Sequence, residues 1–428
     1  MSLAHKNHRP NLINPCFNNV PKSATLAINE KSKALIEQGR EITRLGLGQS
    51  PFPVPEIVVE ELRKNAEVKD YLQVQGLLPL RQAIAEFVKR TEMVEVDAER
   101  IIIGPGSKEL LFGLQMVLDC DLILPAPSWV SYEPQARILN HNCYWIPCSK
   151  ENDWKISAQD LEKHCQNHKD TTQLLILNSP NNPSGAAFTE DELKQLAKVA
   201  EKHQIIVLSD EIYSELHYQG THQSIARYYP QGTIISNGIS KWCGAGGWRL
   251  GAFAFPAELD TVLQAMVILA SESFTSVSAP IQFAAIKAFE PGESMNQYII
   301  ATRSIMKSIG EHLAQTLNAI DIDAVKPYGG FYLIADFSHY RTNLLAKGIT
   351  SSAQLAEKLL LDTGIAGLPG SDFGVTQKEL VLRFAFVDFD GKQLLQRVLD
   401  SGESVLNDQT PELEKLFAVP GKIKNWLG

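Results

Sequence analysis

The chain has 428 residues, of which 44% are hydrophobic and 21% are charged, as is ordinary for a globular protein. Its length exceeds the roughly 250–300 residues at which a single hydrophobic core stops growing, so we expect two domains. The formal net charge of -9 and the lack of a long basic run argue against nucleic acid or an anionic membrane surface as the main partner.

Short apolar runs alternate with helical stretches through the first part of the chain. The runs span residues 101–103, 121–124, 174–177, 205–208 and 233–235, and an amphipathic stretch spans 189–203. Runs that are apolar throughout are typical of strands buried on both faces. Their alternation with helices predicts an α/β fold, with a mostly parallel sheet covered by helices. Ligands of such sheets bind beyond the carboxyl ends of the strands.

The alternation fades near Glu290. A long helical stretch follows, and then a strand at 329–334, a helix at about 352–362 and a strand at 381–384. We therefore expect a large ligand-binding domain at 51–295 and a smaller α+β domain at 296–428. The N-terminal segment 1–50 is expected to join the smaller domain, and the pattern does not place the tail at 409–428.

Four polar residues near two strand ends form the most informative pattern. Lys241 follows a strand and lies among glycines and tryptophans, and Arg249 comes eight residues later. Asp210 ends the preceding strand, with Tyr213 three residues on. Pyridoxal phosphate needs an amine that holds its aldehyde as a Schiff base, a carboxylate against its ring nitrogen and a cation on its phosphate. A surface lysine and a helix-capping aspartate are the alternatives for either residue taken alone.

Other strand ends carry further candidate contacts. Ser107 and Lys108 open a helix directly after a strand and a glycine, where free amides favour a phosphate, although ordinary helix capping explains the pattern equally well. Trp129 could lie over a planar ring or pack in the core. Asn182 lies in a loop of turn-forming residues, and Arg383 on a late strand could bind a carboxylate or form a surface ion pair.

The six cysteines form no C-x-x-C pair and no Cys/His cluster at metal-ligand spacing, so we expect reduced thiols and no metal site. No stretch approaches the roughly 20 apolar residues of a membrane span, and the first residues lack the apolar region of a secretory signal. The sequence therefore predicts a cytoplasmic protein that does not interact with membranes.

Taken together, three motifs resemble those of the class I and II aminotransferases, and more narrowly the bacterial aspartate-aminotransferase-like branch. The motifs are Ser-Asp-Glu-Ile-Tyr at 209–213, Asn-Asn-Pro-Ser-Gly at 181–185, and Ser-Lys at 240–241 followed by Gly-Trp-Arg at 247–249. The likeness extends from about Ser23 to Asp390. It implies the pyridoxal-phosphate transferase fold of type I, in which the large domain has a mostly parallel sheet of the seven-stranded type. It also implies a transaminase that moves an amino group from an L-amino acid to a 2-oxo acid through a Schiff base at Lys241.

The resemblance assigns roles to individual residues. Lys241, Asp210 and Tyr213 would be catalytic, and the cofactor's phosphate would be bound by Ser107, Lys108, Ser240 and Arg249, with Tyr71 reaching it from the neighbouring subunit. Trp129 would stack on the ring. Asn182 would contact both cofactor and substrate, and Arg383 and the backbone of Gly48 would bind the substrate α-carboxylate. A homodimer with shared active sites is implied by Tyr71 and by 275–276, and residues 21–27 resemble the family's N-terminal segment.

Two departures from the family pattern affect the expected substrate. Gln49 and Ser50 stand in a segment that usually carries two acids, and Met116 occupies a helix position where some acidic-substrate relatives carry a basic group. A desolvated carboxylate without a cation is costly to bury. Apolar residues are also expected near the site, namely Phe52, Trp242, Phe331 and Tyr332. We therefore expect neutral or aromatic amino acids to be preferred over aspartate, unless a lysine or arginine of the partner chain fills the gap.

Two alternatives remain open at this point. A pyridoxal-phosphate-dependent lyase, decarboxylase or cyclopropane-forming synthase on the same fold would share nearly every cofactor contact. A non-catalytic regulator that binds the cofactor usually adds a basic DNA-binding module, and this chain has neither the extra length nor the charge.

Overall fold

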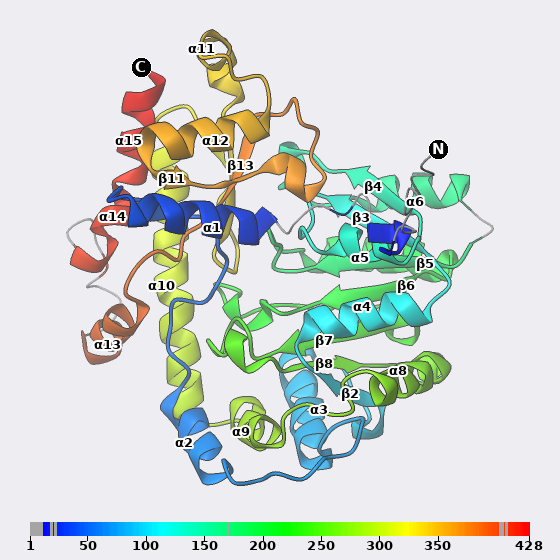
Figure 1. Cartoon of the computed structure of the whole chain (residues 1–428). Coiled ribbons are helices and arrows are strands. Elements are labelled where there is room, and N and C mark those ends of the chain that lie inside the picture. Colours follow the sequence, from blue (N-terminus) through cyan, green and yellow to red (C-terminus); the bar gives the residue numbers. More distant parts are fainter. Residues whose placement is uncertain (1–11, 18–19, 21–23, 169–170, 402–405, 407–409) are drawn as a thin grey trace, which may run out of the picture.

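The protein is described from a computed structural model, which covers residues 12–17, 20, 24–168, 171–401, 406 and 410–428. A seven-stranded sheet with helices on both sides forms the larger part, and a smaller sheet with its own helices lies beside it (Figure 1). Residues 21–23 of the N-terminal segment and residue 409 of the tail, which the sequence analysis included, lie outside the described residues.

The large sheet is mostly parallel, as the sequence predicted. Its strands are β2 (Ile101–Gly104), β3 (Asp121–Ala126), β4 (Cys143–Pro147), β5 (Gln173–Asn178), β6 (Ile206–Asp210), β7 (Thr233–Gly238) and β8 (Gly251–Ala254). They are arranged in the order β2-β8-β7-β6-β5-β3-β4, and β8 alone runs antiparallel to its neighbours. The sequence analysis missed β8, which consists mainly of glycine and alanine, and β4, an edge strand that is only partly buried.

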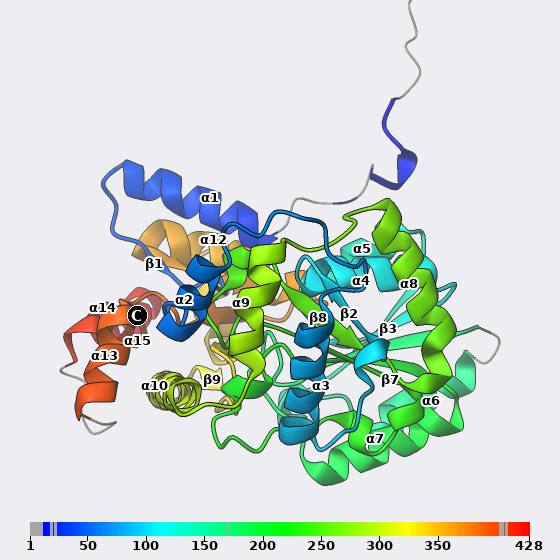
Figure 2. The ribbon, with the colours of Figure 1, turned by 90° about the horizontal axis from the view of Figure 1, so that it is seen from below.

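Successive residues of each central strand enter two different hydrophobic cores. In β5, Leu174 and Ile176 belong to one core, and Leu175 and Leu177 belong to the other. The first core is covered by α4 (Ser107–Val117), α5 (Tyr132–Ile138) and α8 (Asp260–Glu272), and the second by α6 (Ala158–Asn167) and α7 (Glu190–Lys202). Figure 2 shows these two groups of helices on opposite sides of the sheet. A strand with both faces covered has to be apolar throughout, which explains the uniform runs in the sequence.

Helices near the antiparallel end of the sheet form a third packed region. It contains α2 (Glu56–Lys64), α3 (Leu78–Glu92) and α9 (Ala279–Phe289), and α9 packs on both of the others. The 26-residue helix α10 (Glu293–Asn318) passes beside them and also contacts β9 and α13 of the smaller part (Figure 1). The largest hydrophobic core is therefore shared by both parts of the chain.

The smaller part is built on an antiparallel sheet in the order β12-β13-β10-β9. These strands are β9 (Asp323–Ala324), β10 (Tyr332–Asp336), β12 (Leu368–Pro369) and β13 (Val381–Ala385), and the helices are α11 (Arg341–Ala346), α12 (Ser352–Thr363) and α13 (Gly391–Ser401). The predicted strands at 329–334 and 381–384 and the helix at 352–362 correspond to β10, β13 and α12.

Both ends of the chain pack on the smaller part. Near the N-terminus, α1 (Ala24–Glu37) lies beside α12 in both views, and β1 (Thr43–Arg44) pairs in parallel with β11 (Ile365–Ala366) (Figures 1 and 2). In the tail, α14 (Glu414–Phe417) is followed by α15 (Val419–Leu427), which contacts α10 and α12.

We propose the division of the chain at residues 50 and 295, since all seven strands of the large sheet lie between these positions. None of the helices in the described ranges combines the length and hydrophobicity that a membrane span needs.

Candidate active site

A cavity of about 450 Å³ opens where the parallel strands of the large sheet end. This volume is in the usual range for a small-molecule site. The cavity is lined by Gly48, Gln49, Ser107, Lys108, Trp129, Tyr132, Asn178, Asn182, Asp210, Ile212, Tyr213, Ser240, Lys241, Gly246, Gly247 and Arg249. Residues that follow β2, β3, β5, β6 and β7 thus meet in one place. Arg249 joins them because the antiparallel strand β8 begins at this edge of the sheet.

The side-chain amine of Lys241 points to the N-terminal segment. Its Nζ donates a hydrogen bond of 2.7 Å to the backbone oxygen of Gly48. Burial is the main cause that lowers the pKa of Lys241 to about 8; the positive charges of Arg383, Lys108 and Arg249 act in the same direction, and the negative charge of Asp210 opposes them. A much larger fraction of this amine is therefore neutral near pH 7 than for an ordinary lysine, and a neutral amine can attack a carbonyl.

Asp210 is a buried carboxylate at the end of β6. The hydroxyl of Tyr132 donates to its Oδ2 at 2.5 Å, and the backbone amide of Ile212 donates to its Oδ1 at 3.4 Å. Burial raises the pKa of Asp210 to about 6, while these two hydrogen bonds favour the charged form and limit the rise. Asn178 fixes the backbone beside it, because Nδ2 of Asn178 donates to the carbonyl oxygen of Asp210 at 2.8 Å. The carboxylate remains mostly ionised at neutral pH.

Tyr213 presents a buried phenol to the cavity. Its hydroxyl lies 2.8 Å from the hydroxyl of Tyr332, and the Nζ of Lys241 lies 5.7 Å from the centre of its ring. Burial raises the pKa of Tyr213 well above its ordinary value, so the group stays protonated and can donate a hydrogen bond.

Arg383 is a buried cation behind Asn182. Its Nη1 donates to Oδ1 of Asn182 at 3.2 Å, and its Nη2 donates to the carbonyl oxygen of Gly46. The guanidinium lies over the rings of Tyr332 and Phe373, at 4.7 and 5.1 Å from their centres. Arg383 is 2% exposed, and within the described part of the chain its Nε has no hydrogen-bond partner. This burial rules out a surface ion pair and leaves a cation that an anionic group could approach through Asn182.

The start of α4 and the start of β8 form a cradle rich in backbone amides. Ser107 and Lys108 are the first two residues of α4, and the amides in the first turn of a helix have no partner within the helix. The guanidinium of Arg249 lies against this turn and donates to the carbonyl oxygen of Pro105 at 3.1 Å. A Cβ added to Gly106 would lie 2.4 Å from Nη2 of Arg249, so only glycine permits this approach. Ser240 lines the same end of the cavity.

Trp129 lines the cavity next to Lys108. The ring of Trp129 packs edge-on against Tyr132, with 5.3 Å between the ring centres. The Nζ of Lys108 lies 4.9 Å from the centre of the Trp129 ring. Burial lowers the pKa of Lys108, and the nearby charge of Arg249 adds to this effect. The cavity thus contains a cation besides Lys241 and Arg249.

Several residues expected near the site lie elsewhere. Met116 is 45% exposed and lines a separate cavity between α4 and α8, so within this chain it does not reach the cavity that holds Lys241. Trp242 is buried and stacks on Phe87, and Phe52 is also buried in the core. Phe331 and Tyr332 are buried too, but they lie beside the site, as expected: the Nζ of Lys241 is 5.8 Å from the centre of the Phe331 ring, and Tyr332 contacts Tyr213. These positions result from the direction of each side chain, which spacing along the sequence does not determine. Met116 therefore gives no reason within this chain to expect a neutral substrate, whereas the aromatic residues Phe331 and Tyr332 do lie near Lys241.

Tyr71 and the segment 275–276 also lie outside the cavity. The side chain of Tyr71 is 87% exposed, and Thr275 is exposed with a positive φ of 59°. Neither is among the residues that line the site within this chain. Their proposed contribution to an active site requires a second subunit.

Tyr132 and Asn178 are site residues that the sequence analysis missed. Asn178 is the last residue of its strand. The expectation that polar residues at strand ends face the ligand, which identified Asp210, could therefore also have identified Asn178. Tyr132 lies 78 positions before Asp210, and its hydrogen bond to that carboxylate is a tertiary contact. The sequence analysis named Trp129 in the same stretch, but nothing in the sequence singles out Tyr132 three residues later.

The family profile described as "Aminotransferase class I and II" matches residues 40–396. The chain belongs to the class I and II aminotransferases. It is therefore a transaminase, and the motif resemblance at 181–185, 209–213, 240–241 and 247–249 is confirmed at the level of the family.

Curated relatives and solved structures agree with this assignment. An aspartate aminotransferase of Bacillus sp. (strain YM-2) is 35% identical over 363 residues, which cover 82% of this chain and 89% of the relative. The aspartate/prephenate aminotransferase of Thermus thermophilus is 33% identical, with the same shares covered. The structure of the Thermus thermophilus aspartate aminotransferase with maleate matches 93% of this aminotransferase and all of that chain, at a TM-score of 0.81 and 29% identity. The predicted fold is thereby confirmed.

Proposed function

We propose that this aminotransferase uses pyridoxal phosphate bound at Lys241 to move an amino group from an L-amino acid to a 2-oxo acid. The observation that carries the proposal is the amine of Lys241, whose pKa is lowered to about 8 in one cavity with Asp210 and Arg249. An amine, a carboxylate and a phosphate-binding cation are the three groups that this cofactor requires.

The chain's own residues fit the cofactor at both ends. At the phosphate end, a Cβ on Gly251 would lie 2.4 Å from the amide nitrogen of Ser107, so glycine is needed where β8 passes the start of α4. The free amides there and the guanidinium of Arg249 suit an anion. At the ring end, the buried Asp210 would pair with the ring nitrogen, and Trp129 would stack on the ring. These assignments support pyridoxal phosphate over other carbonyl cofactors.

When bound, pyridoxal phosphate supplies an aldehyde and a ring that accepts electrons from the bonds at the substrate Cα. Asp210 would hold a proton at the ring nitrogen, because a buried carboxylate is stabilised by an adjacent cation. Tyr213 would donate its hydrogen bond to the ring's phenolic oxygen. Lys241, released by the substrate amine, would take the proton from the substrate Cα and deliver it to C4′ of the cofactor. Its lowered pKa suits both steps of this transfer.

The substrate α-carboxylate would be bound by Asn182 and Arg383. Arg383 is held in place by Asn182, the carbonyl of Gly46 and two aromatic rings, so little side-chain freedom remains to be lost on binding. A buried cation of this kind gains most from a bidentate anionic partner. The arrangement would select α-amino acids and 2-oxo acids whatever their side chain.

Reduction of the purified protein with borohydride tests the assignment of Lys241. We expect peptide mapping to find one pyridoxyl group per chain, on Lys241, because its amine is the buried one beside Asp210. Lys241→Ala should lose the label and transamination. The exposed Lys202→Ala, whose partner is the surface residue Glu162, should retain both. A pyridoxyl group on any other lysine of the native enzyme contradicts the assignment.

We further propose that the amino donor is a dicarboxylic amino acid such as L-aspartate, which replaces the expectation of a neutral donor. The phosphate and the α-carboxylate engage Arg249 and Arg383, and Lys241 reacts with the aldehyde. Lys108, which the resemblance assigns to the phosphate, is a further cation in the cavity and lies against Trp129, where it could instead face the substrate side chain. A second carboxylate needs such a partner when it is desolvated. The aspartate aminotransferase names of the relatives support the same donor.

Substitution of Lys108 separates this role from phosphate binding. We expect Lys108→Met to lower kcat/KM for aspartate at least about tenfold, roughly 1.4 kcal/mol, and for alanine less than about threefold. Steady-state kinetics with both donors measures the difference, and the exposed Lys358→Met serves as the control. Equal losses for both donors would show that Lys108 serves the cofactor and not the substrate side chain.

We also propose a homodimer in which Tyr71 completes the partner's active site. An aromatic side chain that is 87% exposed in the single chain is consistent with a contact made only in an assembly. Thr275 lies in a second exposed segment that the resemblance places at the same interface. The phenol of Tyr71 would donate to the phosphate beside Arg249.

Subunit exchange between two variants tests the shared site. Tyr71→Phe and Lys241→Ala chains are mixed, and in a mixed dimer the second chain lends its intact Tyr71 to the site that retains Lys241. We expect the mixture to be more active than Tyr71→Phe alone, because one complete site forms. The matched control mixes Tyr71→Phe chains with chains that carry both Lys241→Ala and Tyr71→Phe. This mixture should gain nothing, because neither chain has an intact Tyr71. No gain in the first mixture, with a monomer in sedimentation, contradicts the proposal.

A further inference from the structure

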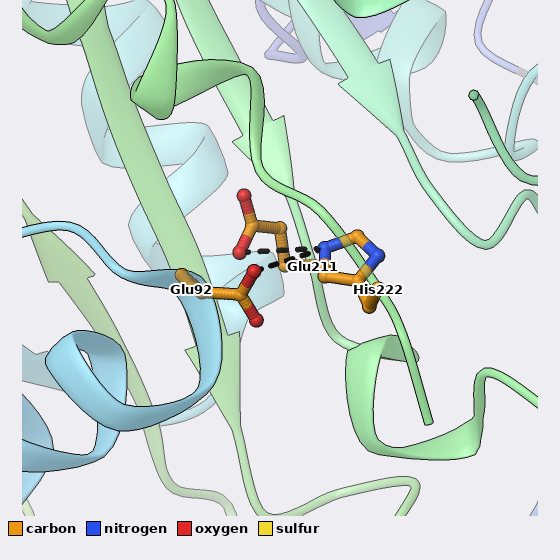
Figure 3. Close-up of side chains that lie close together, drawn as sticks. All are labelled: Glu92, Glu211 and His222. Atoms are coloured by element: carbon orange, nitrogen blue, oxygen red, sulfur yellow. Dashed lines mark ion pairs between the residues drawn. The ribbon is translucent and has the colours of Figure 1, made fainter. Parts of the chain in front are cut away.

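Glu92, Glu211 and His222 meet in the interior (Figure 3), and none of them lines the cavity that holds Lys241. We call them the buried triad. Glu92 ends α3, Glu211 follows the last residue of β6, and His222 lies in the loop before the short helix Ile225–Arg227. The Nε2 of His222 lies 3.6 Å from Oε2 of Glu92 and 3.7 Å from Oε2 of Glu211. Figure 3 shows both carboxylates directed towards one edge of the imidazole.

Polar atoms of the triad are buried without hydrogen-bond partners within the described residues. Glu92 is 1% exposed, Glu211 is fully buried and His222 is 8% exposed. Within the described residues, no hydrogen bond is made by Nε2 of His222, by Oε2 of Glu211 or by either carboxylate oxygen of Glu92. The separations of 3.6 and 3.7 Å exceed the length of a hydrogen bond. Four unpaired polar atoms around one point are costly unless a further group lies between them.

The groups around the triad leave the carboxylate oxygens that face His222 without a hydrogen bond, so ion pairs with the imidazole are their contacts within the described residues. Glu215 is paired with Arg303, at 3.7 Å. The Arg227 guanidinium donates to the backbone carbonyls of Glu92 and Thr91. The hydroxyl of Ser209 donates to Oε1 of Glu211 at 2.7 Å and so orients that carboxylate. A divalent cation would balance both carboxylates while the imidazole stays neutral.

We propose that the buried triad is a structural metal site that binds one zinc ion through Glu92, Glu211 and Nε2 of His222. The candidate ligand atoms all lie within 4.8 Å of one another. Zinc bonds of about 2.0–2.2 Å in a tetrahedral site require ligand atoms about 3.3–3.5 Å apart. The separations at His222 are within a few tenths of an ångström of this. One imidazole and two carboxylates form a mixed nitrogen and oxygen set that suits zinc better than magnesium or calcium. The site contains no cysteine, which is why Cys/His spacing in the sequence did not reveal it.

A zinc ion here would hold together three segments that meet next to the active site. It would connect the end of α3, the end of β6 and the loop at His222. Glu211 directly follows Asp210, and its backbone amide donates to the carbonyl oxygen of Ser236 in β7 at 2.9 Å. The ion would therefore fix the backbone beside Asp210 without touching the cofactor or the substrate. This proposal does not depend on the identity of the substrate.

Metal analysis of the full-length holoenzyme tests the proposal. The protein is dialysed against zinc chloride, freed of unbound metal by gel filtration and analysed by mass spectrometry for metal content. We expect about one zinc per chain in the wild type and less than about a tenth of this in Glu92→Gln and His222→Gln. The double variant His164→Gln,His168→Gln, which removes a stacked pair of histidines outside the triad, should keep the full amount.

A second measurement covers the case in which the triad variants do not fold. X-ray absorption at the zinc edge of the wild-type enzyme should show nitrogen and oxygen ligands only, at about 2.0–2.1 Å, with no sulfur. Zinc should also raise the Tm of the wild type and of the His164→Gln,His168→Gln control equally. A wild-type enzyme that retains no zinc overturns the proposal and leaves a proton or a water molecule between these groups. Zinc that persists in Glu92→Gln and His222→Gln, or sulfur ligation, also overturns it.

Discussion

The candidate active site depends on the burial of two oppositely charged groups, away from water, at the ends of neighbouring strands. Asp210 ends β6 and Lys241 follows β7, and both side chains face one cavity. Burial disfavours the charged form of each, so it raises the pKa of Asp210 to about 6 and lowers that of Lys241 to about 8. The carboxylate remains mostly charged at neutral pH and the amine becomes partly neutral. An electron-withdrawing cofactor needs the charged carboxylate, and attack on a carbonyl needs the neutral amine.

The two parts of the chain create this environment together. The large sheet supplies the strand ends, and the smaller part supplies Arg383 on β13 and Tyr332 on β10. The N-terminal segment contributes the carbonyl oxygens of Gly46, which accepts from Arg383, and Gly48, which accepts from Lys241. A Cβ on Gly48 would lie 1.9 Å from the hydroxyl of Tyr332, so the segment can pass between the two parts only as glycine. Cavity shape and Lys241 reactivity are therefore linked to the packing of the smaller part.

Much of the fold could be predicted because the central strands are apolar on both faces. The runs that became β2, β3, β5, β6 and β7 needed no knowledge of tertiary structure, and Asp210 and Lys241 follow from their positions at strand ends. Contacts between distant segments could not be read in this way. The bond from Tyr132 to Asp210 depends on how α5 packs on the sheet, and the position of Met116 depends on which face of α4 meets α8. Strand β8 lacks the β-branched residues that usually mark a strand.

The pH dependence of Lys241 reactivity in the cofactor-free enzyme tests the central claim most directly. Only the neutral amine reacts with fluorodinitrobenzene, so the labelling rate at Lys241, followed by peptide mass spectrometry, rises as pH passes through its pKa. The account predicts a midpoint at about pH 8 in the wild type. It predicts a higher midpoint in Arg383→Gln, because a neighbouring positive charge is lost, and no change in the exposed Arg341→Gln. A wild-type midpoint near the ordinary lysine pKa of about 10.4 would contradict the account.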